Sequence, residues 1–369
     1  MKFSCEKYLI LQAVVIASRS AASKSPIPAL EGLLIQAGSD VKITGYDLKK
    51  GIYTSFPADV AETGAIVLNA KLLGEIVRSL PDGIVDISTD GMKTSIHCGA
   101  SDFTVLGTDS SEYPELPSVD KQNTVSIPQN TLGKMIRQTS FAISDNESRP
   151  VYTGALFDIK EGYLSIVAVD GYRLALRKEG METESEELSF IVPGSALNDV
   201  EKLCSDTEDN AEIHVGSKHI SFIMGDTVLI SRRLEGEFLN YNKSIPTQFA
   251  TRAELDRNDF MRAVSRVSLV IDEKTKNPVR LTVNEDTIDL SCRTGIGNAD
   301  DSCETRVEGN AGLTIGFNNR YLLDALRAAP AEKITIGLNT ASSPAVMMPS
   351  DGSDGFAYMI LPVRLRSGE

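Results

Sequence analysis

Pairs of basic residues at helical spacing are the strongest chemical signal in this sequence. The members of each pair lie three, four or seven residues apart, so both would project from one face of a helix. Such cations can contact phosphate groups without reading any base. On a single helix the pattern most often indicates only a solvated face, but its recurrence favours a phosphate-binding surface. The four pairs are Lys71 and Arg78, Lys134 and Arg137, Arg262 and Arg266, and Arg320 and Arg327.

Signals for catalysis are weak. The three histidines, His97, His214 and His219, do not stand in metal-ligand spacing with any cysteine. The chain has no G-x-x-x-x-G-K-S/T motif and no G-x-S-x-G motif. A nuclease or hydrolase that uses a carboxylate pair is a weak alternative, because any one pair is uninformative among 51 acidic residues. We therefore expect no catalytic residue, no metal and no cofactor.

Composition sets further bounds. The net charge of −14 argues against nucleic-acid binding unless the basic residues gather on one surface. With 41% hydrophobic and 24% charged residues, the chain resembles an ordinary globular protein. The apolar run YLILQAVVIA is too short to span a bilayer, and we expect neither a signal peptide nor a membrane segment. Five scattered cysteines without a C-x-x-C motif indicate reduced thiols and a cytoplasmic location.

A threefold repeat organises the 369 residues. Residues 312–338 read as strand, helix and strand, in which Asn318 can cap the helix and Pro330 ends it. The same pattern occurs twice upstream, with equivalent positions at Asn69 and Pro193, so that the copies are 124 and 125 residues apart. Apolar residues follow each start at offsets of four, seven and eleven: Leu73, Ile76 and Leu80, then Leu197, Val200 and Cys204, then Leu322, Ala325 and Ala329.

Each repeat also opens with a short strand and a helix. The apolar stripes of these helices are Ile10, Ala13, Val14 and Ala17, then Leu132, Met135, Ile136 and Thr139, then Phe260, Ala263, Val264 and Val267. Alternating apolar residues separated by turn-forming segments follow, which predicts antiparallel strands. We predict an α+β fold of three repeated domains, 1–122, 123–248 and 249–369, each with two helices packed on one side of antiparallel sheets.

Helix dimensions limit any ring built from these domains. Six helices at roughly 9 Å spacing would enclose a hole of only about 7 Å, which excludes a duplex. Twelve helices from two chains would leave a bore of about 25 Å, which admits one. A ring around duplex DNA would therefore need two chains, with the first domain of one chain meeting the third domain of the other.

Five motifs lie along the chain: MKFSCEK at its start, TGYD at 44–47, VDGYRLAL at 169–176, IGFNNRYLLDAL at 315–326 and MILPVRL at 359–365. In this order and spacing they resemble the bacterial sliding clamp, the beta subunit of DNA polymerase III. The resemblance implies three clamp domains per chain and a head-to-tail homodimeric ring that encircles duplex DNA without sequence preference. It implies a non-catalytic processivity factor that tethers the replicative polymerase, is loaded by an ATP-driven clamp loader and binds other proteins through short hydrophobic peptides.

The resemblance also assigns a partner-peptide pocket between the second and third domains. Met, Leu, Val and Pro residues near a chain end are suited to an adaptable apolar site, although MILPVRL also reads as a last core strand. Leu239 stands where the family pattern has proline and Ser244 where it has an apolar residue, which predicts a more polar wall. The pocket residues are Tyr152, Gly171, Tyr172, Arg173, Leu174, Leu239, Lys243, Ser244, Asn318, Tyr321, Ser343, Met359, Ile360, Leu361, Pro362, Val363, Arg364 and Leu365.

For DNA contact, the resemblance gives Lys24, Lys71, Asn146 and Arg149. Lys71 is also a member of one of the four basic pairs, so the resemblance adds three residues to those pairs. For the dimer interface it gives Phe103 and Val105 on the first domain, and Leu269 and Val270 on the third. Apolar pairs at a sheet edge are consistent with such an interface, but ordinary core strands would look the same. The alternative function is a repeat-built scaffold that binds proteins and does not encircle DNA.

Overall fold

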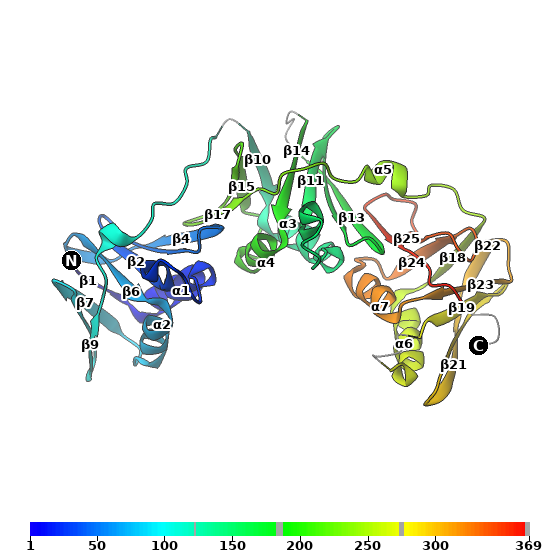
Figure 1. Ribbon diagram of the computed structural model, residues 1–369, viewed down its shortest axis with the longest axis horizontal. Coiled ribbons are helices and arrows are strands. Elements are labelled where there is room, and N and C mark those ends of the chain that lie inside the picture. The colour runs from blue at the N-terminus through cyan, green and yellow to red at the C-terminus, as the bar shows by residue number, and fades with distance from the viewer. Residues whose placement is uncertain (122, 182–186, 273–276, 366–369) are drawn as a thin grey trace. The chain divides into compact units, whose positions relative to one another are not determined.

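A computed structural model describes residues 1–121, 123–181, 187–272 and 277–365 (Figure 1). The chain divides into two compact units. The first contains Met1–Gly133 and Asn198–Arg233, and the second contains Lys134–Leu197 and the residues from Leu234 onward. Each unit holds two antiparallel sheets, so the predicted sheet type is confirmed for the described residues.

The first unit contains a five-stranded sheet in the order β5-β1-β7-β8-β9 and an eight-stranded sheet in the order β10-β15-β16-β17-β4-β3-β2-β6. Alternating burial along β8, with every second residue buried, shows why these sequences form half-buried strands. The strands are β1 Lys2–Glu6, β2 Gly32–Ala37, β3 Val41–Tyr46, β4 Lys50–Phe56, β5 Asp59–Glu62, β6 Gly64–Asn69, β7 Ile84–Asp90, β8 Lys93–Cys98, β9 Ser101–Leu106, β10 Thr124–Pro128, β15 Asn210–Val215, β16 His219–Met224 and β17 Thr227–Arg232.

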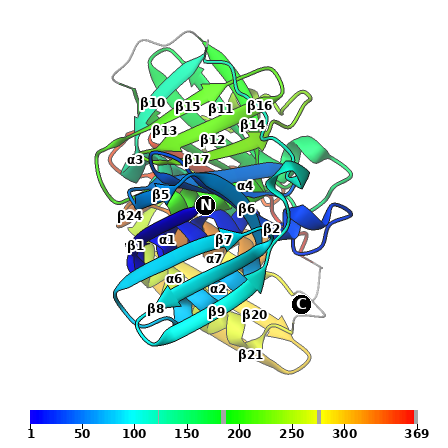
Figure 2. The ribbon, with the colours of Figure 1, turned by 90° about the vertical axis from the view of Figure 1, so that its left-hand side faces the viewer.

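Helices α1 (Lys7–Ala17) and α2 (Ala70–Ser79) pack against each other in the first unit. Figure 2 shows β7, β8 and β9 in front of these two helices, which therefore lie on one side of the five-stranded sheet. The predicted stripe of α1 is buried, from Ile10 to Ala17, in a core that both sheets line. The side chain of Asn69, which is the position equivalent to Asn318 in the repeat, caps α2 by accepting a hydrogen bond from the backbone N–H of Leu72 at 3.0 Å.

The second unit contains a nine-stranded sheet in the order β14-β11-β12-β13-β26-β25-β24-β18-β22 and a four-stranded sheet in the order β21-β20-β19-β23. Its strands are β11 Gly154–Lys160, β12 Tyr163–Val169, β13 Arg173–Gly180, β14 Leu188–Pro193, β18 Thr251–Asp256, β19 Val279–Val283, β20 Thr287–Thr294, β21 Gly297–Glu304, β22 Arg306–Gly309, β23 Leu313–Phe317, β24 Lys333–Leu338, β25 Ala345–Pro349 and β26 Phe356–Ile360.

Helices α6 (Arg257–Val267) and α7 (Asn319–Ala328) repeat in the second unit the arrangement of α1 and α2, since they also pack against each other. The predicted stripe of α6 is buried from Phe260 to Val267. Caps begin both helices: the side chain of Asp256 accepts from two backbone N–H groups of α6, and that of Asn318 accepts from the backbone of Arg320 at 2.9 Å. The predicted similarity of the first and third repeats is therefore visible in the fold.

The central repeat contributes α3 (Gln129–Arg137) and α4 (Gly194–Leu203). Helix α3 ends at Arg137, so Thr139 lies beyond it, although the predicted burial of Thr139 is correct. The last apolar offset of each repeat likewise falls just outside its helix, at Leu80, Cys204 and Ala329. A further one-turn helix, α5 (Tyr241–Ser244), was not expected from the sequence.

Two strand pairings join consecutive repeats. Within the first unit, β4 pairs with β17 over five residue pairs, from Thr227 with Thr54 to Ser231 with Lys50. An ion pair between Lys50 of β4 and the buried Asp199 of α4 supports this junction. Within the second unit, β13 pairs with β26 over five residue pairs. Both pairings were outside what the repeat pattern predicted.

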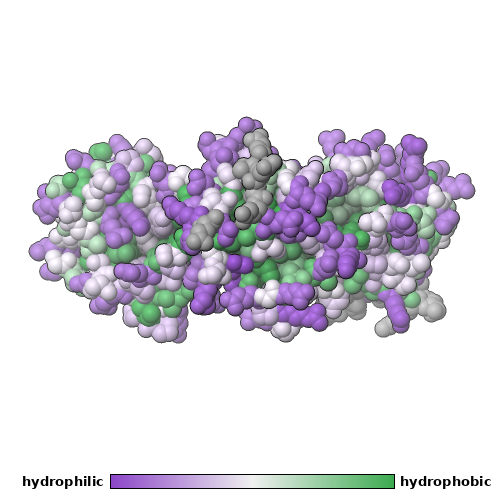
Figure 3. All heavy atoms as spheres, turned by 90° about the horizontal axis from the view of Figure 1, so that it is seen from above, coloured by the Kyte–Doolittle hydropathy of each residue, from purple (hydrophilic) through white to green (hydrophobic). Residues whose placement is uncertain are grey.

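The described surface is mainly hydrophilic on the face in Figure 3, with hydrophobic residues in separate patches. None of the helices in the described part of the chain is long and apolar enough to cross a membrane.

Candidate functional site

All of the residues predicted to contact DNA are exposed. Helical geometry explains this, because the apolar stripes of the same helices are buried and turn the polar positions outward. The loop residues of the set lie in segments without regular structure. The exposed residues are Lys24, Lys71, Arg78, Lys134, Arg137, Asn146, Arg149, Arg262, Arg266, Arg320 and Arg327.

These basic residues differ in whether an acidic side chain lies beside them. Arg266 is neutralised by Asp301 of β21, with its Nη2 3.1 Å from Oδ1 of that carboxylate. Hydrogen bonding from Arg266 lowers the pKa of Asp301, so the pair is charged at neutral pH. Arg262 lies 3.5 Å from Asp259, and Arg327 lies 3.4 Å from Asp324. On α2, by contrast, neither basic residue has an acidic partner among the described residues, which leaves its full charge for a ligand.

An arginine at the start of β13 organises the first half of the predicted peptide site. Arg173 donates from Nε to Asp170 at 2.8 Å and from Nη1 to Asp324 of α7 at 2.7 Å. Its guanidinium also lies 4.5 Å from the ring centre of Tyr321, which stacks on Tyr172 with 6.1 Å between ring centres. The ring of Tyr172 is 62% exposed, so this cluster offers an aromatic surface.

The tight turn before Arg173 depends on Asp170 and Gly171. Oδ1 of Asp170 accepts from the backbone N–H groups of Tyr172 and Arg173 at 2.9 and 3.0 Å. Gly171 has φ of +92°, a conformation that residues with a side chain rarely adopt. The sequence motif thus encodes the turn that presents Tyr172.

An apolar cluster forms the second half of the predicted peptide site. Leu174 is buried in it, and Tyr152, Leu239 and Met359 are partly buried against it. The ring of Tyr152 meets that of Phe238 edge to face at 5.4 Å. Strand pairing explains part of this proximity, because Leu174 of β13 lies opposite Met359 of β26. The structure therefore brings these predicted residues together from four separate chain segments.

The C-terminal motif is only partly a core strand. Met359 and Ile360 belong to β26, whereas the following residues leave the sheet. Leu361 donates its backbone N–H to Tyr172 at 2.9 Å and Val363 to Gly316 at 2.8 Å. Their side chains are 36% and 38% exposed. The remaining predicted residues lie around these two clusters: Lys243 and Ser244 in α5, Asn318 and Tyr321 at the start of α7, Ser343 before β25, and Pro362, Arg364 and Leu365 at the end.

Two sheet edges carry the predicted dimer residues. Strand β9 is the outer strand of the five-stranded sheet, and Phe103 and Val105 are half-buried on it. Strand β21 is the outer strand of the four-stranded sheet, and the 3-10 helix Ser268–Val270 packs beside it. In that helix the side chain of Leu269 is 82% exposed. Edge strands with exposed apolar residues are ready to pair with another chain.

Sequence reasoning missed two residues at these edges. Leu106 at the end of β9 and Ile296 in the turn before β21 are each 74% exposed. Leu106 lies on the opposite face of β9 from Val105, so the alternation could have revealed it. The sequence also contained no signal for Asp324 as a partner of Arg173, because the two residues are 151 positions apart.

The thiols are unsuited to catalysis. All five cysteines are free. Burial raises the pKa of Cys5 and Cys204 to about 12 and that of Cys303 to about 11. Protonated thiols are poor nucleophiles. Within the described ranges, no group of three or more His, Cys, Asp or Glu residues is placed to hold a metal ion.

Repeated helix-and-sheet domains with cations on their helices define a clamp-type protein. Models of the DNA polymerase III beta subunit match the chain three times, as its N-terminal domain at residues 1–117, its central domain at 126–240 and its C-terminal domain at 242–364. The chain therefore belongs to the family of DNA polymerase III beta subunits, the beta sliding clamps, which are non-catalytic processivity factors of DNA replication.

Individual relatives agree over almost the whole chain. The beta sliding clamp of Staphylococcus aureus is 31% identical, and that of Staphylococcus epidermidis is 30% identical, each over 99% of both chains. Among solved structures, the sliding clamp of Bacillus subtilis superposes with a TM-score of 0.95 at 29% identity. The DNA polymerase III beta subunit of Pseudomonas aeruginosa superposes with a TM-score of 0.93 at 26% identity. In both cases 99% of this chain and all of the other chain are covered.

Proposed function

We propose that two copies of this chain join head to tail into a ring that encircles duplex DNA and slides along it. In that ring each chain supplies three clamp domains, 1–122, 123–248 and 249–369. The observation that carries the proposal is the exposure of every predicted DNA-contacting residue on helices and loops whose apolar neighbours are buried. Local positive surfaces of this kind can hold phosphates even though the whole chain is acidic.

The basic residues would act unequally. Those of α2, Lys71 and Arg78, would contribute most in the first domain, since no acidic group offsets them among the described residues. Arg266 would contribute least, because Asp301 already satisfies its guanidinium. Lys24, Asn146 and Arg149 lie in exposed loops and would reach phosphates without a fixed register.

The dimer interface would use two of the sheet edges, those formed by β9 and β21. Strand β9 of one chain would lie against β21 of its partner, and Leu106, Leu269 and Ile296 would be covered by the contact. Such pairing would satisfy backbone groups that an edge strand leaves open to solvent. A ring of this kind has two equivalent interfaces, because the association is head to tail and closes after two copies.

Partner proteins would bind through short hydrophobic peptides at the two clusters around Arg173 and Leu174. The half-exposed aromatic and aliphatic side chains there, with backbone groups of the C-terminal segment nearby, suit an extended peptide with apolar anchors. The replicative polymerase and the clamp loader would use this site in turn. These functions belong in the cytoplasm, where replication takes place in bacteria.

Retention on circular DNA tests encirclement. The protein is loaded onto a nicked circle by a compatible clamp loader, and the circle is then cut once. The ring should remain on the intact circle and leave the linear product. Equal loss from circular and linear DNA would instead support a scaffold that binds proteins only.

A further inference from the structure

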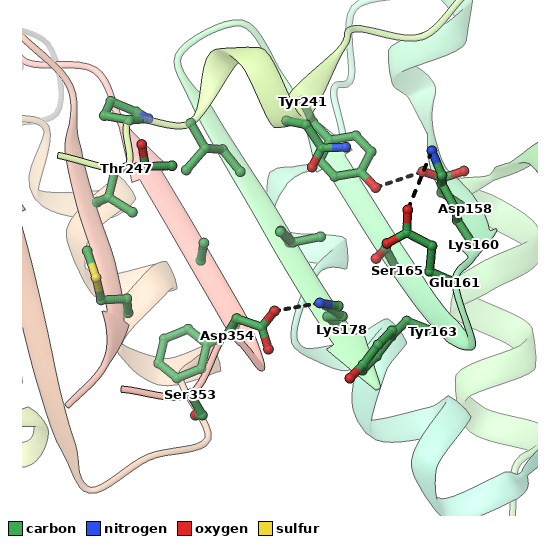
Figure 4. A pocket seen from close by; sticks show the side chains of 18 of the residues that line it. Asp158, Lys160, Glu161, Tyr163, Ser165, Lys178, Tyr241, Thr247, Ser353 and Asp354 are labelled. Atoms are coloured by element: carbon green, nitrogen blue, oxygen red, sulfur yellow. Dashed lines mark hydrogen bonds and ion pairs between the residues drawn. The ribbon is translucent and has the colours of Figure 1, made fainter. Parts of the chain in front are cut away.

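A cavity of about 500 Å³ lies in the second unit, over strands β11, β12, β13, β25 and β26 and beside the chain segment 241–249 (Figure 4). None of its lining residues was predicted for the peptide site, although Leu176, Tyr241 and Ile245 also belong to the apolar cluster around Leu174. The two share the neighbourhood of α5, but Asn242 and Ile245 line the cavity whereas Lys243 and Ser244 belong to the predicted peptide site. A volume of this size is typical of sites for small organic ligands.

The middle of the cavity is apolar. Leu176 of β13 and Val346 and Met348 of β25 provide side chains from two strands of one sheet that flank β26. Ile245 and Phe249 line it from the segment that joins α5 to β18. These side chains can cover an aromatic or branched aliphatic group. Burial of apolar surface in such a contact stabilises the complex by about 25 cal/mol per Å².

One end of the cavity is a hydrogen-bonded carboxylate. Asp158 of β11 accepts a hydrogen bond from the hydroxyl of Tyr241 at 2.7 Å. Burial and this carboxylate raise the pKa of Tyr241 to about 12, so the tyrosine remains a donor at neutral pH. A carboxylate has about four acceptor positions, and Tyr241 uses one.

The other charges of the cavity largely cancel. Lys178 pairs with Asp354 and lies 4.0 Å from the ring centre of Tyr163. Lys160 lies 3.9 Å from Glu161, which leaves the Asp158 end with one net negative charge. At the side of the joining segment, Arg252 rests on the ring of Phe249 at 5.6 Å. Among the described residues Asp158 has no ion-pair partner, so it is the group best placed to receive a cation.

We propose that this cavity is a second ligand site that binds an aromatic or branched aliphatic group carrying a primary ammonium, with the ammonium on Asp158 and the apolar body between Leu176, Met348 and Phe249. Such a group could belong to a small amine or to the side chain and terminus of a peptide. The proposal does not require the ring or the predicted peptide site.

Three probes with the same indole body separate the contributions to binding. They are tryptamine, which is cationic, 3-methylindole, which is neutral, and indole-3-propionate, which is anionic. Each is titrated against the full chain by ligand-observed NMR. Tryptamine should bind most tightly and indole-3-propionate most weakly. Asp158→Asn should weaken tryptamine about tenfold and leave 3-methylindole unchanged, since only a charge-assisted hydrogen bond is removed.

Three further variants test whether the probes bind in this cavity. Asp286→Asn removes an exposed acid from a distant turn and should leave all three affinities unchanged. Arg173→Ala alters the predicted peptide site and should retain tryptamine binding, whereas Met348→Trp should fill the cavity and reduce binding of every probe. The proposal is overturned if tryptamine binds no better than 3-methylindole, if Asp158→Asn and Asp286→Asn have equal effects, or if Arg173→Ala abolishes binding of the probe.

Discussion

Replacement of Leu269 by aspartate is the most direct test of the proposed dimer interface. The leucine side chain is 82% exposed in the single chain and lies beside the edge strand β21. It therefore contributes little to the fold of its own chain, and Leu269→Asp should change the free energy of unfolding by no more than about 0.5 kcal/mol. A larger change in the free energy of the dimer would therefore come from the contact between the two chains.

The expected loss can be worked from burial. Covering a leucine side chain in an interface contributes about 1.5–3 kcal/mol, and almost the whole side chain is available here. Each ring contains two equivalent interfaces, so one substitution removes about 3–6 kcal/mol from the dimer. The dimer dissociation constant should rise by roughly two to four orders of magnitude. Desolvation of the new carboxylate would add to this loss.

Sedimentation equilibrium over a wide concentration range measures the effect directly. The matched control is Leu48→Asp, which replaces another exposed leucine at a turn with φ of 70°, where aspartate is better tolerated than leucine. That variant should dimerise as the unmodified chain does. If Leu269→Asp dimerises as tightly as Leu48→Asp, then Leu269 is not in the interface and the proposed edge pairing is wrong.

Three further predictions follow from the ion pairs and exposed cations. Arg173→Ala should weaken a polymerase-type hydrophobic peptide at least tenfold in a fluorescence titration, and it should lower the free energy of unfolding by about 1–3 kcal/mol, because it leaves Asp170 without its cation. Lys71→Ala with Arg78→Ala should weaken duplex binding and reduce the salt slope of log K by up to about 2, whereas Arg266→Ala should change it little. The pair of Arg266 with Asp301 should make the free energy of unfolding slightly higher for the unmodified chain than for Arg266→Ala at neutral pH. This difference should disappear as acid protonates Asp301 below its lowered pKa.

Matched controls accompany these measurements. Arg306→Ala removes another exposed arginine and should leave peptide affinity unchanged. Lys93→Ala with Lys218→Ala removes two exposed lysines from strand ends and turns, and should not change the salt slope. A salt slope that falls equally for the Lys71 and Arg78 double variant and for the Lys93 and Lys218 double variant would contradict a DNA surface on the helices. Stability that depends on Arg266 equally at acidic and neutral pH would contradict the assigned ion pair.

The helices of the fold could be predicted because their information is local. The stripe from Ile10 to Ala17 and that from Phe260 to Val267 each repeat at helical spacing, and both are buried as predicted. Asn318 could be predicted as a cap for the same reason, and Asn69 stands at the equivalent position of the first repeat. The exposure of the basic positions follows directly from these buried stripes, since a helix face is fixed once its opposite face is known.

Contacts between distant segments could not be predicted in this way. Arg173 and Asp324 are neighbours only because β13 and α7 meet in the second unit, and nothing in either segment indicates the other. Tyr241, at the start of the short helix α5, donates its hydroxyl hydrogen bond to the carboxylate of Asp158, which lies 83 positions away in the sequence. The sequence could not predict the cavity beside that tyrosine either, because its lining comes from six strands and the segments that connect them.

The strand pairings that join consecutive repeats have a mechanical consequence. The pairing of β4 with β17 and that of β13 with β26 each align five residue pairs, so relative movement of the joined repeats would have to shear several backbone hydrogen bonds at once. At the first junction, separation would also strand the buried carboxylate of Asp199 away from Lys50. These junctions should therefore resist hinge motion. If a ring of two such chains is pried apart for threading onto a circle, it should yield at the boundary between subunits, which no continuous backbone crosses.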